Sequence, residues 1–317
     1  RERNEYARKN YFYADLPKGY QITQDTTPIC NGGAIQIKDK DGNPKNIKIT
    51  RIHMEEDAGK SIHDLDPFNT LVDLNRAGVP LVELVSEPDI RSSEEAYQYI
   101  TEVRKLVRYL DICDGNMEEG SLRCDANVSV MLKGAKEFGT KVEVKNMNSS
   151  RNVMRAIEFE IDRQIELLET GGEISHETRS FNAANNSTIS MRHKEDANDY
   201  RYFPEPDLQP VIVTKEYINK VRKTLPPLPN ELFLIFTKEY KSRAVVVIHK
   251  DQIIAEKYAD GFNKDSKFLG WSMTKSILST VFGVMQHQGK INVLEKAPIA
   301  SWQNDARKNI TINNLLQ

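Results

Sequence analysis

Regular alternation of apolar and polar residues marks strands in the first half of the chain. Apolar residues recur at every second position in 35–37 and again in 47–49, on either side of the turn Asp41-Gly42-Asn43-Pro44. Alternation with period two around such a turn predicts a hairpin over 35–54. Further strands are predicted at 71–74, 81–85, 121–132 and 141–145.

Two segments have the apolar spacing of helices instead. Ser92 and Glu95 form a capping box before an apolar series that ends at Leu110. A second amphipathic helix is predicted through Met154 to Leu168, and it ends at Gly171-Gly172. Because strands precede the helices without a regular strand–helix–strand rhythm, we expect an α+β fold, with a largely antiparallel sheet and packed helices.

A proline-rich stretch divides the chain. Residues 225–230, Leu-Pro-Pro-Leu-Pro-Asn, cannot continue a helix or a central strand. We therefore predict two domains, 1–232 and 237–317, with a junction at 233–236. In the second domain a hairpin that pairs 244–248 with 252–258, followed by a helix from Trp271, indicates a small α/β fragment.

The composition is that of an ordinary globular protein, with 39% hydrophobic and 28% charged residues among 317. Residues 1–235 hold 32 basic and 39 acidic side chains, whereas residues 236–317 hold 12 and 7. The first part is therefore acidic. This charge is a poor match for binding nucleic acid along the whole surface, and a better one for a site that collects divalent cations.

The same composition bears on location. No run approaches the roughly 18 apolar residues of a membrane span, and the N-terminus is not a signal peptide. The three cysteines, Cys30, Cys113 and Cys124, lack the spacing of a disulfide framework or a zinc site. We expect a cytoplasmic protein without a membrane partner. The start at Arg1 and the apolar pattern at the end predict that both ends are cut.

Carboxylates occupy unexpected places in the predicted strands. Glu83 lies in a strand with apolar residues on both faces, and a buried carboxylate needs a cation or a metal as partner. Glu143 shares a face with Lys141 and Lys145, which is typical of a solvated surface or of a cradle for a phosphate and its metal. The acidic group 55–57 at a strand end offers the hard oxygen ligands that Mg²⁺ prefers.

Each of these carboxylates also has an ordinary interpretation: a buried ion pair for Glu83, a surface strand for Glu143, and a solvated acidic turn for 55–57. Gly59-Lys60-Ser61 does not complete a phosphate-binding P-loop, because Met54 stands where the motif needs glycine. Any bound ATP is therefore held in another way.

Histidines and aromatic residues give weaker signals. The histidines have no mutual spacing of a metal set and are expected to be structural: His53, His63, His176 and His193. An aromatic and basic run from Met191 to Phe203 fits either stacking on single-stranded nucleotides or ordinary packing, and packing is the more common use of such residues.

Five long blocks give the first part of the chain a specific resemblance. The blocks are Arg8–Gln21, Arg51–Lys60 (Arg-Ile-His-Met-Glu-Glu-Asp-Ala-Gly-Lys), Val85–Ile90, Met117–Asn127 and Asp199–Asp207 (Asp-Tyr-Arg-Tyr-Phe-Pro-Glu-Pro-Asp). In this order they resemble the B-subunit family of aspartyl/glutamyl-tRNA amidotransferases, from Arg1 to about Leu232.

The resemblance implies a cytoplasmic ligase that works with subunits A and C. The B subunit of such an enzyme uses Mg²⁺ and ATP to phosphorylate the side-chain carboxylate of Asp or Glu misacylated onto tRNA. Ammonia derived from glutamine then displaces the phosphate. Phosphoryl transfer of this kind depends on metal ions that neutralise phosphate charge.

The resemblance also implies site residues. It places catalytic groups at Glu56, Glu83, Glu143 and Lys145, and a metal site at Glu56, Glu83 and Glu143 with Glu55 nearby. Arg123, Asp125 and Lys145 are predicted to hold the nucleotide, which is an inference from position. An opening strand with a further Glu and His, and a tail domain that binds tRNA, belong to the family pattern and are absent from this sequence.

The last 80 residues show a second resemblance. Ser272 and Lys275 form the motif S-x-x-K at a predicted helix start, where one helical turn brings the amine beside the hydroxyl. With the blocks around it, residues 237–317 resemble the N-terminal part of serine β-lactamases and penicillin-binding proteins. Because later motifs of that family are absent, we expect no useful hydrolase activity; an exposed Ser and Lys on a helix turn is the structural alternative.

Overall fold

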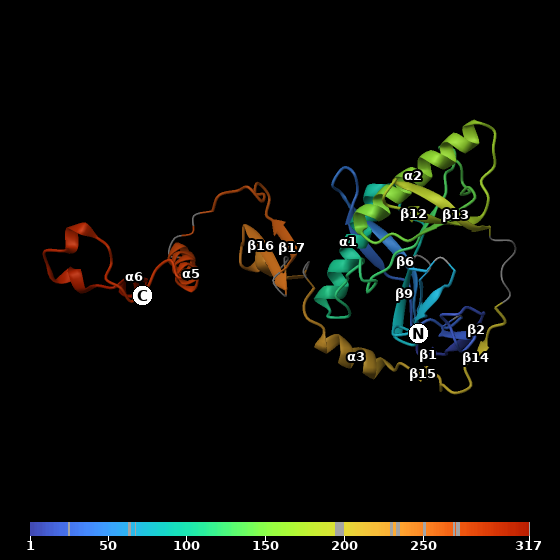
Figure 1. Ribbon diagram of the computed structural model, residues 1–317, viewed down its shortest axis with the longest axis horizontal. Coiled ribbons are helices and arrows are strands. Elements are labelled where there is room, and N and C mark those ends of the chain that lie inside the picture. Colours follow the sequence, from blue (N-terminus) through green and yellow to red (C-terminus); the bar gives the residue numbers. More distant parts are fainter. Residues whose placement is uncertain are drawn as a thin grey trace. The chain divides into compact units, whose positions relative to one another are not determined.

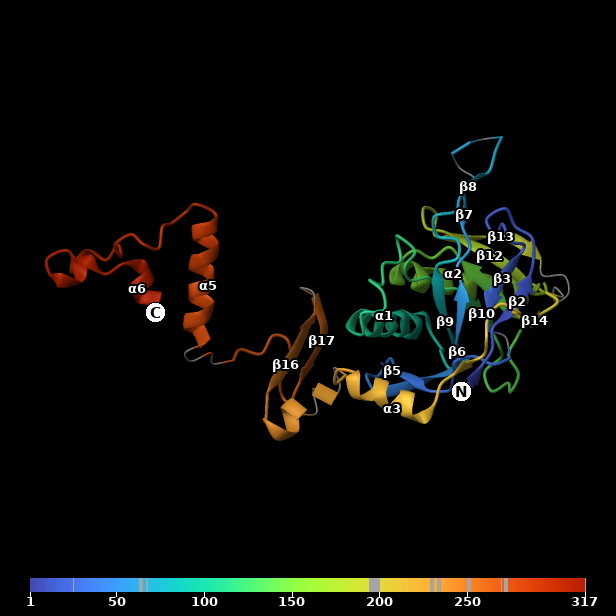
Figure 2. The same ribbon diagram turned by 90° about the horizontal axis from the view of Figure 1, so that it is seen from below.

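The computed structural model describes residues 1–24, 26–62, 65–66, 68–193, 200–228, 231–232, 235–249, 252–268, 270 and 273–316. They form two compact units. Unit 1 comprises Arg1–Leu232 with Val246–Ala255, and unit 2 comprises Phe233–Val245 with Glu256–Gln317. Figures 1 and 2 show the elements of each unit.

A seven-stranded sheet forms one layer of unit 1, and its strand pairs are antiparallel. Its central member is the long strand β6 (Pro44–Glu56), which pairs with β5 (Ala34–Lys38) in the predicted hairpin. Along the remaining path the order is β14-β2-β3-β6-β4, and β9 also pairs with β6. These strands are β14 (Phe203–Pro204), β2 (Ala7–Asn10), β3 (Tyr20–Thr23), β4 (Cys30–Asn31) and β9 (Pro80–Ser86).

The register of this sheet decides which side chains share a face. On one side of β6, His53 lies opposite Glu83 of β9. On the other side, Glu55 lies opposite Thr23 of β3, which in turn lies opposite Ala7 of β2. Directly opposite residues share a face, as do residues two apart along a strand. One face of the sheet therefore carries His53, Glu55 and Glu83 together.

A second sheet has four strands in sequence order: β10 (Ala126–Val128), β11 (Val142–Lys145), β12 (Glu177–Asn182) and β13 (Ser187–His193). Its β11–β12 pair is parallel, because the helix α2 (Ser150–Glu169) connects the two strands, and the other two pairs are antiparallel. Two further short pairs lie within residues 1–232: β1 (Arg3–Asn4) with β15 (Val211–Ile212), and β7 (Lys60–Ile62) with β8 (Leu71–Asp73). Figure 2 shows β7 and β8 extending beyond the end of β6.

The first helix begins at its predicted cap, and the second begins four residues before the predicted apolar series at Met154. Ser92 caps α1 (Ser93–Tyr109) by accepting a hydrogen bond from the backbone N–H of Glu95, and Ser149 caps α2 (Ser150–Glu169) in the same way. The main core lies between these helices and the second sheet, as Figure 1 shows. Its fully buried members include Val142, Val144, Ala156 and Phe181. A third helix, α3 (Lys215–Thr224), has no buried residues.

The mixture of packed helices and mainly antiparallel sheet confirms the α+β prediction. The strand predicted over 121–132 is wrong in its extent, since only Ala126–Val128 pairs as β10. Arg123 and Asp125, at the start of that segment, form ion pairs outside any ladder.

Unit 2 contains a helix, short helical turns and part of a hairpin. The hairpin strands are β16 (Ala244–His249) and β17 (Gln252–Tyr258), and the helix is α5 (Met273–His287). The remaining elements are η1 (Ile235–Glu239), η2 (Ala300–Trp302), η3 (Ala306–Asn309) and α6 (Ile312–Leu316). Among the described residues of unit 2, Ala297 is the single buried apolar side chain. A β-lactamase-like α/β fragment would need a packed apolar core. The described residues of unit 2 do not show such a fragment.

Within the described part of the chain, no helix combines the length and apolar character that crossing a membrane requires.

Candidate functional site

Two carboxylates and an imidazole meet on one face of the seven-stranded sheet. His53 Nε2 lies 3.7 Å from Glu55 Oε2 and 3.7 Å from Glu83 Oε2. One ligand atom from each of the three residues lies within 4.8 Å of the other two. The cluster forms because β6 places His53 and Glu55 two residues apart, while the β6–β9 register places Glu83 opposite His53.

This cluster fits a divalent cation. Separations of 3.7 Å are too long for hydrogen bonds, so the three groups flank a common space rather than satisfy one another. Ligands that each lie 2.0–2.6 Å from one ion are about 3 to 5 Å apart, which is the range found here. His53 is buried, and its Nδ1 has no hydrogen-bond partner among the described residues. Its polar environment is therefore the carboxylate pair, of which Glu83 is 49% exposed and open to a ligand.

Glu56 does not belong to this cluster. Adjacent residues of a strand point to opposite faces, so Glu56 leaves the face that holds Glu55. Its carboxylate forms an ion pair with Lys18 and accepts a hydrogen bond of 2.8 Å from the backbone N–H of Ile22. A lysine balances the charge of Glu56, and the role of Glu56 as a metal ligand stays a prediction.

Glu143 is positioned by the second sheet instead. It accepts a hydrogen bond of 3.0 Å from Thr178 Oγ1, and its carboxylate lies 3.4 Å from Lys145 Nζ. Among the described residues, Glu143 is outside the metal-type cluster. The structure thus separates the predicted ring of carboxylates into the cluster of Glu55 and Glu83 and two ion-paired residues, Glu56 and Glu143.

Lys145 and Asp125 lie together, as their predicted common face implies. Ala126 of β10 lies opposite Val144 of β11, so Asp125, the residue before Ala126, lies beside Lys145. The side chains of Asp125 and Lys145 form an ion pair. Burial lowers the pKa of Lys145, but the carboxylates of Asp125 and Glu143 outweigh it, and the net pKa is raised. Lys145 is therefore a permanent cation at neutral pH, suited to an anionic group.

Arg123 pairs with a different carboxylate. Its guanidinium and that of Arg76 both contact Asp57 Oδ2, the latter at 3.2 Å. Asp57 is buried, so its charge is neutralised by the two arginines rather than offered to a metal. The Arg123 side chain is 42% exposed and keeps donors for an anion, whereas Arg76 also donates to the backbone oxygens of Ala58 and Gly59.

The glycine that follows this aspartate has a structural reason. A Cβ at Gly59 would lie 2.8 Å from the backbone oxygen of Asp73, which only glycine tolerates. Gly59 therefore allows the chain before β7 to pack closely against the backbone of Asp73.

Only one residue of the second resemblance's predicted pair lies within the described part of the chain. Ser272 lies outside the described residues, as does part of the junction 233–236. Lys275 is exposed in the first turn of α5. The predicted Ser272–Lys275 pair thus stays a prediction.

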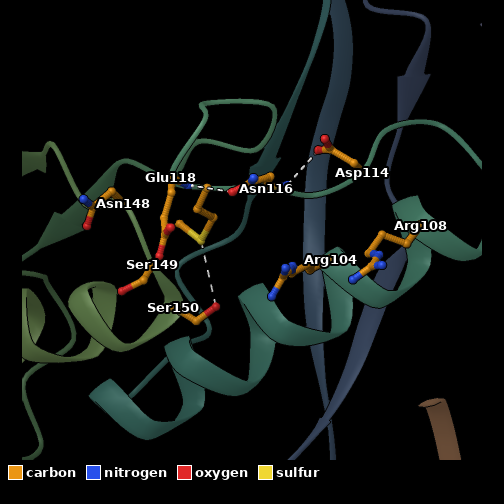
Figure 3. Close-up of a pocket in the computed structure, with 9 residues that line it drawn as sticks. Arg104, Arg108, Asp114, Asn116, Glu118, Asn148, Ser149 and Ser150 are labelled. Carbon is orange, nitrogen blue, oxygen red and sulfur yellow. Dashed lines mark hydrogen bonds between the residues drawn. The ribbon is translucent and has the colours of Figure 1, made fainter. Parts of the chain in front are cut away.

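A separate open pocket of about 370 Å³ lies where α1, the loop 114–118 and the start of α2 meet (Figure 3). Arg104 and Arg108 of α1 line it opposite Asp114. Backbone donation from Asn116, together with the Ser121 hydroxyl and the two arginines, holds the pKa of Asp114 below its usual value. None of the predicted site residues lines this pocket.

His53 is the residue that sequence reasoning missed. The sequence does contain a signal: in Arg51–Glu56 the alternation of a strand places His53 and Glu55 on one face. The useful signal is the two-residue spacing between a histidine and a carboxylate in one strand. The spacing between histidines, which the sequence analysis considered, gives no such signal.

The structure thus defines an α+β domain with a cluster of divalent-cation type on one sheet face. The chain belongs to the GatB/GatE catalytic domain family, because the family model matches residues 1–219. Proteins named as the B subunit of aspartyl/glutamyl-tRNA(Asn/Gln) amidotransferase are similar to it. That of Halorhodospira halophila is 59% identical over 238 residues, 75% of this chain and 50% of that protein. That of Alkalilimnicola ehrlichii is 58% identical with the same coverage.

The relative from Bdellovibrio bacteriovorus is 52% identical over 282 residues, 87% of this chain and 58% of its own length. An alignment that covers 87% of this chain must extend beyond residue 237, into the part that was predicted to be the second domain. None of these matches supports the predicted resemblance of residues 237–317 to serine β-lactamases. The chain spans about half the length of the curated relatives it matches.

Proposed function

We propose that the chain provides the ATP- and Mg²⁺-dependent activation step of a tRNA-dependent amidotransferase, as its B subunit. The substrate is Asp or Glu misacylated onto tRNA, and the partners are subunits A and C in the cytoplasm. The observation that carries the proposal is the His53–Glu55–Glu83 cluster within a domain of the GatB/GatE family. The names of the relatives supply the substrate class.

In the proposed reaction the side-chain carboxylate of the amino acid attacks the γ-phosphorus of ATP. An acyl phosphate forms and ADP leaves. Ammonia then attacks the acyl carbon, the bond between this carbon and the phosphate oxygen breaks, and the products are the amide and inorganic phosphate. A bound Mg²⁺ supplies charge neutralisation to the phosphates in the first step. His53, Glu55 and Glu83 are the residues that would hold it.

In this proposal three cationic residues bind the nucleotide: Lys145, Arg123 and Arg76. Lys145 keeps its proton at neutral pH because Asp125 and Glu143 stabilise the charge, so it can orient a phosphate without donating a proton. Arg123 and Arg76, oriented by Asp57, present planar donors that match phosphate oxygens. Asp125 and Glu143 act in this proposal by positioning Lys145.

The test combines the chain with subunits A and C of a relative, misacylated tRNA, glutamine and ATP. We expect amidated aminoacyl-tRNA and tRNA-dependent ADP formation, and a loss of at least about tenfold in both on Glu83→Gln. Glu119→Gln, at an exposed carboxylate outside the cluster, is the matched control. ADP formation that Glu83→Gln leaves unchanged would contradict the proposal.

No second function is proposed for residues 237–317, since no observation favours hydrolysis there. A fluorophosphonate probe, which labels activated serines, is expected to leave Ser272 unlabelled.

A further inference from the structure

Arg51 of β6 is a half-buried arginine whose charge is not balanced by the protein around it. Its Nε is buried and has no hydrogen-bond partner, and the guanidinium forms no ion pair among the described residues. Arg8 of the same sheet, in contrast, binds the buried carboxylate of Glu205 through two hydrogen bonds of 2.7 and 2.8 Å. Because buried donors are nearly always bonded, the free donor of Arg51 indicates a ligand.

Arg51 lies on the sheet face that carries the metal-type cluster. It precedes His53 by two residues in β6. Residues two apart in a strand point to the same side, with Cα atoms about 7 Å apart. Arg51 lies opposite Val85 of β9 on one side and opposite Asn31 of β4 on the other. Neither of these residues carries a charge, so Arg51 is a cation beside the cluster rather than one half of an ion pair.

Two buried polar atoms without a partner belong to neighbouring residues of this face. Besides Arg51 Nε, His53 Nδ1 has no hydrogen-bond partner among the described residues, and His53 is only 5% exposed. Glu83 is diagonal to Arg51 across the two strands, but its carboxylate lies 3.7 Å from His53 Nε2 and forms no ion pair with Arg51. Negative and positive groups are thus held side by side without neutralising one another. A metal ion with a bound phosphate satisfies both.

The cluster lies between Arg51 and the cations proposed to hold the nucleotide. Asp57 directly follows the C-terminal end of β6, and it pairs with Arg123 and Arg76. Arg51 lies before the cluster in the same strand. A nucleotide held at the Asp57 end therefore directs its terminal phosphoryl group across the metal towards Arg51. Since the attacking and leaving oxygens lie in line on opposite sides of phosphorus, Arg51 is on the side where the acceptor enters.

We propose that Arg51 binds the phosphoryl group while it passes from ATP to the substrate carboxylate. This inference rests on the proposed function for the reaction itself. In that step a carboxylate oxygen forms a bond to the γ-phosphorus, the bond from this phosphorus to the bridging oxygen breaks, and ADP leaves with the electron pair of that bond. Arg51 donates hydrogen bonds to the phosphoryl oxygens and keeps its proton, so it stabilises charge and transfers no proton.

The position of Arg51 favours the later part of the transfer. As the acyl phosphate forms, the phosphoryl group moves away from the cations that hold ATP and towards Arg51. A contact that strengthens along the reaction accelerates it, whereas a contact that is equally strong with ATP only increases the affinity for ATP. Arg51 therefore contributes to the binding of an acyl phosphate much more than to the binding of ATP.

The experiment measures the Kd of acetylphosphonate, a stable analogue of an acyl phosphate, by calorimetry on the chain loaded with Mn²⁺. We expect Arg51→Met to raise this Kd at least about tenfold, because charge-assisted hydrogen bonds to the phosphonate are lost. Arg51→Lys keeps the charge but loses the planar pair of donors, and should raise the Kd at least about threefold. The Kd values of Mn²⁺ and of ATP should stay within about twofold in both variants.

The matched control is Arg155→Met, at an exposed arginine of α2 outside the cluster. Its Kd for acetylphosphonate should stay within about twofold. An unchanged Kd in both Arg51 variants, an equal increase in the control, or equally tight binding without Mn²⁺ would overturn the proposal. An intact Mn²⁺ site shows that a variant keeps the register of β6 and β9, and Arg51→Lys decides the question if Arg51→Met does not fold.

Failure of this inference is distinct from failure of the proposed function. The binding assay contains no tRNA, glutamine or partner subunit, so its outcome does not depend on turnover. A chain that binds acetylphosphonate through Arg51 but forms no ADP with misacylated tRNA would contradict only the assigned reaction. An Arg51→Met variant that forms ADP at the rate of the unchanged chain would contradict only the role of Arg51.

Discussion

Neighbouring residues in this sheet have opposite surroundings, and this determines their chemistry. Glu55 joins His53 and Glu83 in a cluster without a balancing cation among the described side chains, whereas Glu56, one residue later, is paired with Lys18. The ion pair with lysine offsets the negative charge of Glu56, whereas Glu55 and Glu83 keep carboxylate oxygens that can act as hard ligands for a divalent cation. The difference of one position along β6 therefore separates a candidate ligand from a structural ion pair.

The environment of single residues also predicts thiol reactivity. Burial, assisted by the charge of Asp125, raises the pKa of the Cys124 thiol to about 12, and the thiolate is the reactive form. At about pH 8 iodoacetamide is expected to modify the exposed Cys30 and to leave Cys124 unmodified. Peptide mass spectrometry after a short exposure measures both. Modification of Cys124 as rapid as that of Cys30 would contradict this account.

A pH dependence is expected at Glu205. The Arg8 guanidinium holds the pKa of this buried carboxyl below its ordinary value of 4.5. A carboxyl whose pKa is lowered by folding stabilises the native state above its unfolded pKa, and this contribution is lost as pH falls below about 4.5. Glu205→Gln should therefore make the free energy of unfolding less dependent on pH between about 5 and 3. Urea unfolding at several pH values measures the slope; an unchanged slope is the contrary result.

At the scale of elements, a buried charge network joins α2 to the second sheet. Glu160 is fully buried and accepts hydrogen bonds from Arg163 at 2.6 and 2.9 Å, and from Gln164 at 2.9 Å. Arg179 of β12 lies 3.7 Å away and binds Glu177 at 2.8 Å. The network fixes the helix against the sheet that positions Glu143 and Lys145.

Removal of one member of this network should be costly. Glu160→Ala leaves Arg163 and the buried amide of Gln164 without their partner, so the free energy of unfolding should fall by about 3 kcal/mol. Glu166→Ala, at an exposed position of the same helix, should change it by less than about 0.5 kcal/mol. Urea denaturation followed by circular dichroism compares them. Equal stabilities of the two variants would show that the network is dispensable.

The elements that could be predicted from sequence are those fixed by local signals. The cap at Ser92 acts on the next turn of the chain, and the hairpin over 35–54 closes through its own turn. The extent of β10 could not be predicted, because it depends on pairing with β11, whose residues are distant in sequence. The cluster itself depends on the β6–β9 register, which joins residues thirty positions apart.

At the scale of the whole molecule, the two units differ in the packing that defines a domain. Unit 1 has a continuous apolar core between α1, α2 and the second sheet. The described helix α5 of unit 2 has no buried residue. The candidate chemistry therefore belongs entirely to the unit with the packed core, and the stability of that unit maintains the register on which the cluster depends.

His53, Glu55 and Glu83 are expected to hold one divalent cation between them. Titration of the chain with Mn²⁺, followed by electron paramagnetic resonance of the free ion, measures this most directly. We expect one site whose Kd rises at least about tenfold on Glu83→Gln, since a ligand is lost, and stays within about twofold on Glu143→Gln. Binding that Glu83→Gln leaves intact, or that Glu143→Gln weakens equally, would contradict the account.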